Sequence, residues 1–393
     1  MLMHSLRALT ATPLTRAVAL LFLANGFALA NWFSRIPAVK ESLALGDGAL
    51  GLALLGMPLG SALVLPFSGR LIGRLGAGRL ALATGIATAV TAALPGFAPG
   101  FWSLALVLFF LGIANGAMDV AMNAKAAAVE RATSYSVMSA FHGMWAVGFF
   151  LGSSTGGVFA ALAVGPTVHL PLAALIGMTA LLRLRRVLAD KPAARPASDP
   201  MLALPHGPLW PLALIAAASF LAEGSAGDWS AVYLATVVGA SPGVSALALS
   251  GFSLGLMAAR FVADALGARF GDLALLRGGA ALAGIGMTLG LVFPIAPVAI
   301  LGFVAVGMGF AAVVPIAFRR AANLDGIEPG VGVAAVATVA YTGFLAGPPL
   351  IGLVAELIGL RFAMAIVPAL AFAVAALAIT VRAQPRARPA ERR

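Results

Sequence analysis

Charged residues are so sparse in this chain that they leave uncharged stretches long enough to cross a lipid bilayer. Residues 17–34, 48–69 and 80–118 contain no Asp, Glu, Lys or Arg, and residues 278–318 form a further such stretch. A helix needs about 20 apolar residues to span the hydrocarbon core of a bilayer. Only 10% of the residues are charged, whereas a typical soluble domain carries about 25%. The sequence therefore predicts an all-α membrane protein.

Turn-forming residues inside the longest stretches indicate how many helices they contain. Residues 80–118 are interrupted by Pro and Gly at positions 95–100, and residues 278–318 are interrupted at Pro294. Such residues mark turns, so each of these stretches predicts two helices. The total is twelve transmembrane helices. The predicted segments are a first six-helix bundle, a basic and proline-rich cytoplasmic linker, a second six-helix bundle and a basic cytoplasmic tail, at residues 1–182, 183–208, 209–382 and 383–393.

The basic residues predict the orientation of these helices. With both termini placed in the cytoplasm, 22 of the 25 Lys and Arg residues lie on that side, and the exceptions are Arg35, Lys40 and Arg361. Cytoplasmic loops of membrane proteins carry such an excess. This distribution explains the net charge of +11 without a nucleic-acid partner. We expect a multi-pass protein of a bacterial inner membrane.

Short patterns recur at an offset of about half the chain. The glycines of residues 148–157 recur in residues 343–352, and the pattern of residues 69–76 recurs in residues 264–271, in both cases 195 positions later. We therefore expect two pseudo-symmetric six-helix bundles. Transporters with internal repeats bind substrate between the repeats and expose the site to each side in turn.

The twelve helices, their six-plus-six division and the basic linker resemble the major facilitator superfamily over the whole chain. Residues 69–79 look like that family's signature between helices two and three, except that Gly73 replaces its Asp. In the family this acid takes part in a gating contact, so the resemblance marks Arg74 as a gating candidate. We expect Arg260 and Asp264, four residues apart on helix eight, to form a substitute pair. A local helix pair without a gating role is the alternative.

Two narrower resemblances concern the polar residues of the helices. The runs at residues 31–37, 115–123 and 228–230 look like the MosC-like group of bacterial permeases. Helix four also resembles fucose-type proton symporters, which carry an acid four residues before an Asn, as do Asp119 and Asn123 here. The resemblance implies that Asp119 is tied to proton movement. The second acid of those symporters, on helix one, has no match in this sequence.

Asp119 is also the first candidate for proton coupling on physical grounds. An acid within a membrane span costs a few kcal/mol and by default marks a functional site. Asn115, Asp119 and Asn123 follow one another at intervals of four residues, so they share one helix face. A structural acid held by hydrogen bonds is the alternative interpretation.

His142 and Glu223 are the other candidates for proton coupling. A histidine titrates close to neutral pH, although a polar residue satisfied at a helix end is the alternative for His142. We expect helix seven to end near Glu223 or Asp228, in an unwound segment of the kind that forms substrate sites in transporters. For Asp228 itself, a solvated loop acid is the favoured interpretation.

Substrate contacts are predicted at amide and aromatic side chains. Amides can hydrogen-bond to a polar solute, and aromatic rings can stack on one, although core packing or an interfacial anchor is the alternative for a single ring. The candidates are Asn25, Asn31, Asn115, Asn123, Trp145 and Tyr341.

The sequence predicts a secondary transporter and no enzyme. It has no Cys, four His and no nucleotide-binding or hydrolase motif, so we expect no metal, no cofactor and no catalytic residue. We expect a monomeric symporter in the lipid bilayer, with protons and a small polar solute such as a sugar or polyol as its partners. Proton-coupled efflux of a metabolite or amphipathic compound is the alternative, which the glycines of helix five favour. A non-transporting membrane sensor is a further alternative.

Overall fold

The computed structural model describes residues 9, 11–133, 138–189 and 203–381, and these residues form helices joined by short connections. Within them, twelve helical segments are long and apolar enough to cross a membrane, as the sequence predicts. The helices of the first half are α2 (Pro13–Phe33), α3 (Ile36–Ser42), α4 (Asp47–Leu54), α5 (Gly56–Leu75), α6 (Ala77–Ala93), η1 (Leu94–Phe97), α7 (Phe101–Thr133), α8 (Met138–Ala161) and α9 (Pro166–Arg183).

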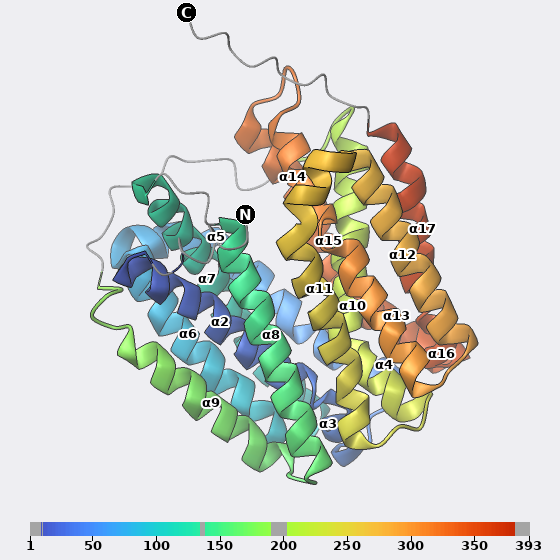
Figure 1. Ribbon diagram of the computed structural model, residues 1–393. Helices are drawn as coiled ribbons and strands as arrows, with labels where there is room; N and C mark the ends of the chain where they lie inside the picture. The colour runs from blue at the N-terminus through green and yellow to red at the C-terminus, as the bar shows by residue number, and fades with distance from the viewer. Residues whose placement is uncertain (1–8, 10, 134–137, 190–202, 382–393) are drawn as a thin grey trace, which may run out of the picture.

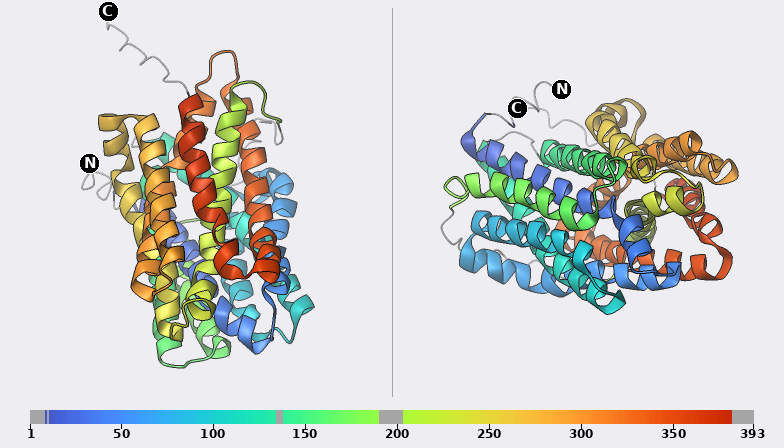
Figure 2. Two further views of the ribbon diagram at one scale, coloured as in Figure 1. Left: turned by 90° about the vertical axis from the view of Figure 1, so that its right-hand side faces the viewer. Right: turned by 90° about the horizontal axis from the view of Figure 1, so that it is seen from below.

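The second half follows the same plan. Its helices are α10 (Leu209–Thr236), α11 (Pro242–Phe270), α12 (Asp272–Val292), α13 (Ala296–Phe310), α14 (Val313–Ala322), α15 (Pro329–Ile358), α16 (Leu360–Ala363), α17 (Ile366–Leu377) and η2 (Ala378–Thr380). Figure 2 shows the first half, coloured blue to green, beside the second half, coloured yellow to red, when the molecule is seen from below.

Equivalent helices pack together in the two halves. In the first half α2 packs on α8 and α5 on α7, and in the second half α10 packs on α15 and α11 on α13. Glycines allow the backbones to come close: a Cβ on Gly26 of α2 would lie only 2.9 Å from the backbone nitrogen of Phe149 in α8. Small residues at helix interfaces have this role in membrane proteins. The predicted pair of pseudo-symmetric six-helix bundles is therefore confirmed.

One predicted helix end is wrong. The sequence predicts that helix seven ends near Glu223 or Asp228, but α10 continues to Thr236. The glycines and Ser225 that suggested an unwound segment lie inside this helix, and Ser225 is buried. Packing of α10 against α15 and α11 overrides the weak local preference of Gly and Ser for turns. Glu223 is consequently near the middle of the helix and Asp228 lies within it.

The halves make their closest contacts on one side of the molecule. We call the side of the molecule on which α2 begins and α17 ends the terminal side, and the opposite side the far side. Near the far side α8 runs beside α11 and α4 beside α15, whereas α8 and α11 separate towards the terminal side (Figure 1). We define the far-side closure by three contacts that join the halves, namely Gly48–Glu356, Gly51–Gly352 and Ser153–Ser250.

Candidate functional site

Three polar side chains of the first half meet inside the membrane. Asn25 of α2 donates a hydrogen bond to the side-chain oxygen of Asn115 on α7, over 2.8 Å. The indole N–H of Trp145 on α8 donates to the side-chain oxygen of Asn25, also over 2.8 Å. The Asn25 side chain is buried, so these partners satisfy polar groups that would otherwise be costly to bury. Asn25, Asn115 and Trp145, all predicted substrate contacts, therefore come together.

The second half adds a charged pair to this cluster. The Arg260 guanidinium of α11 lies over the Trp145 ring, 5.7 Å from its centroid. One of its nitrogens is 3.9 Å from a carboxylate oxygen of Glu223 on α10. The other Glu223 oxygen accepts a 2.9 Å hydrogen bond from the Ser219 hydroxyl. We call Asn25, Asn115, Trp145, Glu223 and Arg260 the central cluster.

Arg260 has a partner on another helix. The sequence predicts a pair between Arg260 and Asp264, one turn further along α11, and the structure places Arg260 beside Glu223 of α10. The side chain of Asp264 lies outside the described residues. Spacing along one helix indicates only which residues share a face, and it carries no information about a neighbouring helix such as α10.

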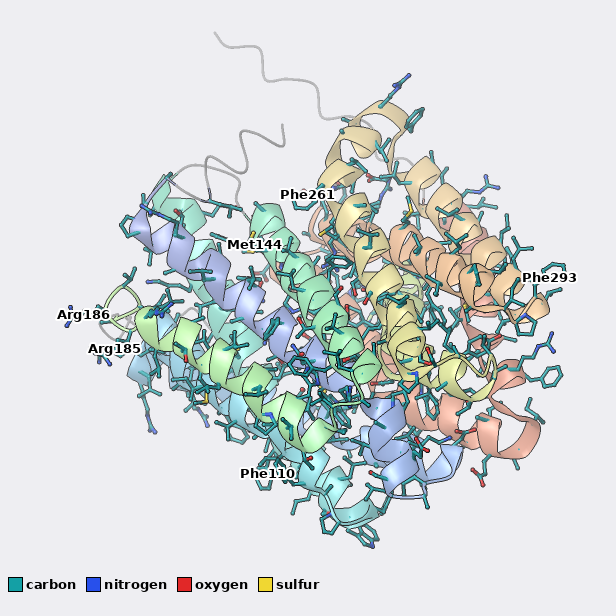
Figure 3. All side chains as sticks on the ribbon, turned by 60° about the horizontal axis from the view of Figure 1, so that its bottom comes forward. Phe110, Met144, Arg185, Arg186, Phe261 and Phe293 are labelled. Atoms are coloured by element: carbon teal, nitrogen blue, oxygen red, sulfur yellow. The ribbon has the colours of Figure 1, made fainter. Side chains whose placement is uncertain are left out.

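Aromatic rings extend the central cluster. The Trp145 ring stacks on Phe149 with centroids 4.8 Å apart. Across the molecule, the Tyr341 ring of α15 lies 5.7 Å from that of Phe220 on α10, and 39% of Tyr341 is exposed. On the terminal side of Arg260, the Phe261 ring is beside Gly143 of α8, and Figure 3 shows Phe261 on the side of α11 towards α8. These rings offer flat surfaces on which a polar solute can stack, and the amides of the central cluster offer it hydrogen bonds.

Asp119 lies one turn beyond Asn115 on α7. One of its carboxylate oxygens accepts a 3.2 Å hydrogen bond from the Asn123 amide, which also donates to the Asp119 backbone oxygen over 2.8 Å. Asp119 interacts electrostatically with Tyr341 of the second half. On the predicted face, Asp119 therefore bonds to Asn123, and Asn115 bonds to Asn25 of the central cluster.

The two remaining candidates have different surroundings. His142 of α8 makes an edge contact with the Phe22 ring, with centroids 5.2 Å apart, and interacts electrostatically with Arg260. Arg74 is exposed near the end of α5. The structure therefore brings His142 to the border of the central cluster and leaves Arg74 away from it.

Asn31 belongs to a second cluster within the first half. Its side-chain oxygen is 2.8 Å from Nε2 of His169 on α9, and its amide donates to the Phe27 backbone oxygen. Arg35 is buried beside this region and donates to the backbone oxygens of Gly156 and Val164. His169 was not among the predicted site residues, and its only signal in the sequence is a histidine inside an apolar span. These contacts favour a structural role for Asn31.

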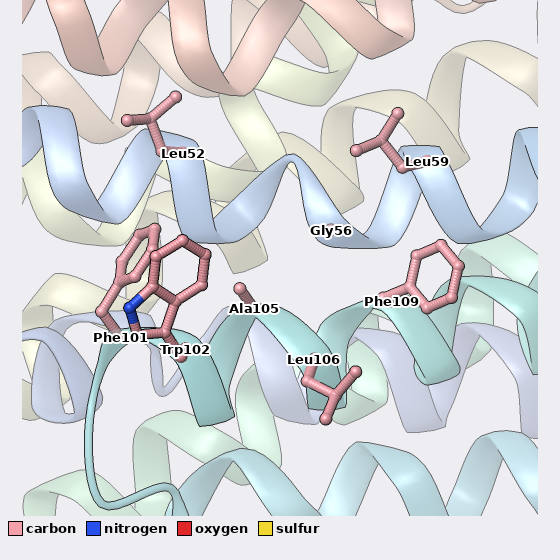
Figure 4. Close-up of a pocket in the computed structure, with 8 residues that line it drawn as sticks. All are labelled: Leu52, Gly56, Leu59, Phe101, Trp102, Ala105, Leu106 and Phe109. Carbon is pink, nitrogen blue, oxygen red and sulfur yellow. The ribbon is translucent and has the colours of Figure 1, made fainter.

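No cluster of three or more metal-binding side chains occurs among the described residues. A groove on the outside of the first half is lined by apolar residues of α4, α5 and α7 (Figure 4). Trp102 at its edge is 82% exposed. Since the groove presents no charged or amide side chain, it is suited to lipid contact and not to a polar solute.

The sequence and the fold are similar to those of known transporters. The model of the Major Facilitator Superfamily matches residues 18–324. The uncharacterized transporter y4wD of Sinorhizobium fredii is 38% identical over 368 residues, which cover 92% of this chain and 97% of that protein. The membrane protein MosC of Rhizobium meliloti is 31% identical over 364 residues, which cover 92% and 89% of the two chains. The MosC-like resemblance is therefore confirmed.

Solved structures share the fold at low sequence identity. A bacterial homologue of the human lysosomal transporter Spinster, in an inward-facing and occupied conformation, has a TM-score of 0.71 and 17% identity, and the match covers 92% of this chain and 95% of that one. The nucleoside transporter NupG has a TM-score of 0.72 and 13% identity, with 95% and 100% covered.

Proposed function

Because the chain belongs to the major facilitator superfamily, we propose that this transporter moves a small polar organic solute, of the sugar or polyol kind, by proton symport. The observation that carries the proposal is the central cluster, in which amides and an aromatic ring of the first half meet a charged pair of the second. A site shared by the two repeats is the arrangement that allows alternating access.

We also propose that the terminal side faces the cytoplasm of a bacterial cell and that the protein acts as a monomer in the inner membrane. The support is the excess of basic residues on the terminal side, which orients membrane proteins. Arg185 and Arg186, just beyond α9, point away from the helices (Figure 3). Residues 183–208 are then a cytoplasmic linker between the bundles at 1–182 and 209–382, and residues 383–393 a cytoplasmic tail.

In the proposed mechanism Asp119 binds a proton from outside, the central cluster binds the solute, and the halves then rotate. Trp145 and Arg260 belong to different halves, so their contact changes when the halves move and a bound solute reaches the other side. Asp119 then releases its proton to the cytoplasm. Glu223 and His142 are further groups that can exchange protons beside Arg260.

Export was the alternative suggested by the glycines of residues 148–157. Packing accounts for them: a Cβ on Gly152 would lie 3.0 Å from the Cβ of Ala30 in α2, and one on Gly157 3.2 Å from the Cβ of Ala246 in α11. These glycines therefore give no separate support to efflux.

Liposomes that contain a pH-sensitive dye test the proposal. Sugars, polyols and amino acids are added in turn to vesicles with the wild-type protein, Asp119→Asn or the control Asp325→Asn, which changes an exposed acid outside the spans. We expect one solute class to acidify the lumen with wild type and control but not with Asp119→Asn. Proton movement opposite to the solute would establish efflux, and unchanged coupling in Asp119→Asn would refute the role of Asp119.

A further inference from the structure

Asp228 is a buried acid that the proposed transport cycle does not use. It lies within α10, eight residues before the far-side end of the helix at Thr236, which corresponds to about 12 Å along the helix axis. Only 9% of the residue is exposed. Within the described residues it has neither a hydrogen bond nor an ion pair.

Asp119 and Glu223, two other acids within the helices, have partners. Asp119 accepts a hydrogen bond from Asn123, and Glu223 accepts one from Ser219 and lies near Arg260. The difference matters because burying an ionised carboxylate without a partner costs several kcal/mol, whereas a protonated one lacks that penalty. Burial without a partner therefore favours the neutral form of Asp228.

Among the described residues, no charged group of the elements that pack against α10 pairs with Asp228. Lys40 of α3 pairs with Asp47, and Arg35 donates to backbone oxygens of its own half. None of these groups interacts electrostatically with Asp228. The remaining ones, on α2, α3, α11, α14 and α15, are Arg16, Glu41, Arg260, Asp264, Arg269, Arg319, Arg320 and Glu356.

The far-side closure covers the level of Asp228. A Cβ on its neighbour Gly227 would lie 3.8 Å from the Phe33 ring of α2, so the first half reaches α10 at this point. Buried polar atoms without a hydrogen-bond partner are found at the same level in both halves, at the indole nitrogens of Trp32 and Trp229. Such atoms require an explanation in a native structure. Contact with water when the closure opens would give these two atoms partners.

We propose that Asp228 is a proton-binding site that must be protonated before the far-side closure can form. When the closure is open, the carboxylate faces the external solution and takes up one proton from it. The neutral acid is then buried as Phe33 and α10 come together. This inference rests on the orientation given under the proposed function, and it adds a proton requirement for closure to the role of Asp119.

The closure can be followed without any solute. The chain has no cysteine, so Leu162→Cys and Ser241→Cys place two nitroxide labels at the exposed far-side ends of α8 and α11. Dipolar broadening between the labels reports the closed far side. We expect broadening in acidic buffer and its loss in alkaline buffer, because one linked proton shifts the equilibrium by up to about tenfold per pH unit.

The same labels in Asp228→Asn decide the assignment. Asparagine is neutral at every pH, so we expect the far side to stay closed in alkaline buffer, while the control Asp325→Asn responds as the wild type does. A wild-type pH response retained in Asp228→Asn overturns the proposal, as does a wild type that does not respond to pH. Closure driven by Na⁺ at constant pH, and lost in Asp228→Asn, overturns it in favour of a metal-cation site. Since no solute is added, these results do not depend on whether Asp119 couples transport.

Discussion

Glu356 of α15 accepts a hydrogen bond from the backbone N–H of Gly48 in the first turn of α4, with 3.0 Å between Oε2 and nitrogen. The two residues belong to different halves. The first turn of a helix has unpaired N–H groups and a partial positive charge, which a carboxylate complements. A Cβ on Gly46 would lie 2.9 Å from the same carboxylate, so the glycine before α4 leaves room for it. This contact stabilises the far-side closure.

Glu356→Gln is expected to weaken this closure. The amide keeps the length of the side chain but loses the charge, and a charge at an exposed helix N-terminus contributes about 0.3–1 kcal/mol. The fraction of molecules with an open far side should rise roughly two- to fivefold. Nitroxide labels at Leu162→Cys and Ser241→Cys measure it. Glu41→Gln is the matched control, because Glu41 is exposed near the same side; an equal response to both substitutions would contradict the assignment.

Gly51→Ala should act on the same equilibrium through packing. Its Cβ would lie 2.6 Å from the backbone oxygen of Pro348 and 2.9 Å from the Cα of Gly352, so the halves have to move apart. Overpacking of this kind costs about 1–3 kcal/mol, and the labels should report a correspondingly larger open fraction than in Glu356→Gln. A Cβ on Gly73 meets nothing within 4 Å, so Gly73→Ala should leave the label spectrum unchanged.

The sequence was sufficient to predict the architecture because lipid imposes simple rules. Helix number followed from the length of the uncharged stretches, and the repeat followed from an offset shared by glycine patterns. Asn25, Asn115 and Trp145 were identified because amides inside a span can hydrogen-bond to a polar solute and an aromatic ring can stack on one. Their residue types indicated the kind of site but not its geometry.

The parts that the sequence did not predict all depend on contacts between helices. Arg260 of α11 interacts with Glu223 of α10. The spacing of residues along the sequence does not show how these two helices are aligned against each other. The end of α10 was misplaced because local preferences of Gly and Ser are weaker than the packing around them. Asp228 was interpreted as a loop acid for the same reason, since its burial depends on where α10 ends.

Trp145→Phe is expected to weaken solute binding through Asn25. Phenylalanine keeps a ring for Arg260 but lacks the N–H that bonds to Asn25. The unsatisfied Asn25 oxygen can cost about 1–3 kcal/mol, so the KM of the solute found in the liposome assay should rise roughly 5- to 150-fold. If the hydrogen bond carries the effect, Trp145→Phe should change KM much less in a protein that already carries Asn25→Ala than it does in the wild-type protein. Additive effects of the two substitutions would show that they act independently.

Asn25→Ala and Asn31→Ala should separate binding from stability, although both remove an amide from the same helix. Asn31 bonds to His169, which is fully buried, and its loss leaves a buried ring nitrogen without a partner at a cost of about 1–3 kcal/mol. We therefore expect Asn31→Ala to lower the melting temperature and to leave KM unchanged in the folded protein. Asn25→Ala should raise KM, because Asn25 connects Asn115 to Trp145. A raised KM in Asn31→Ala at an unchanged melting temperature would instead restore Asn31 as a substrate contact.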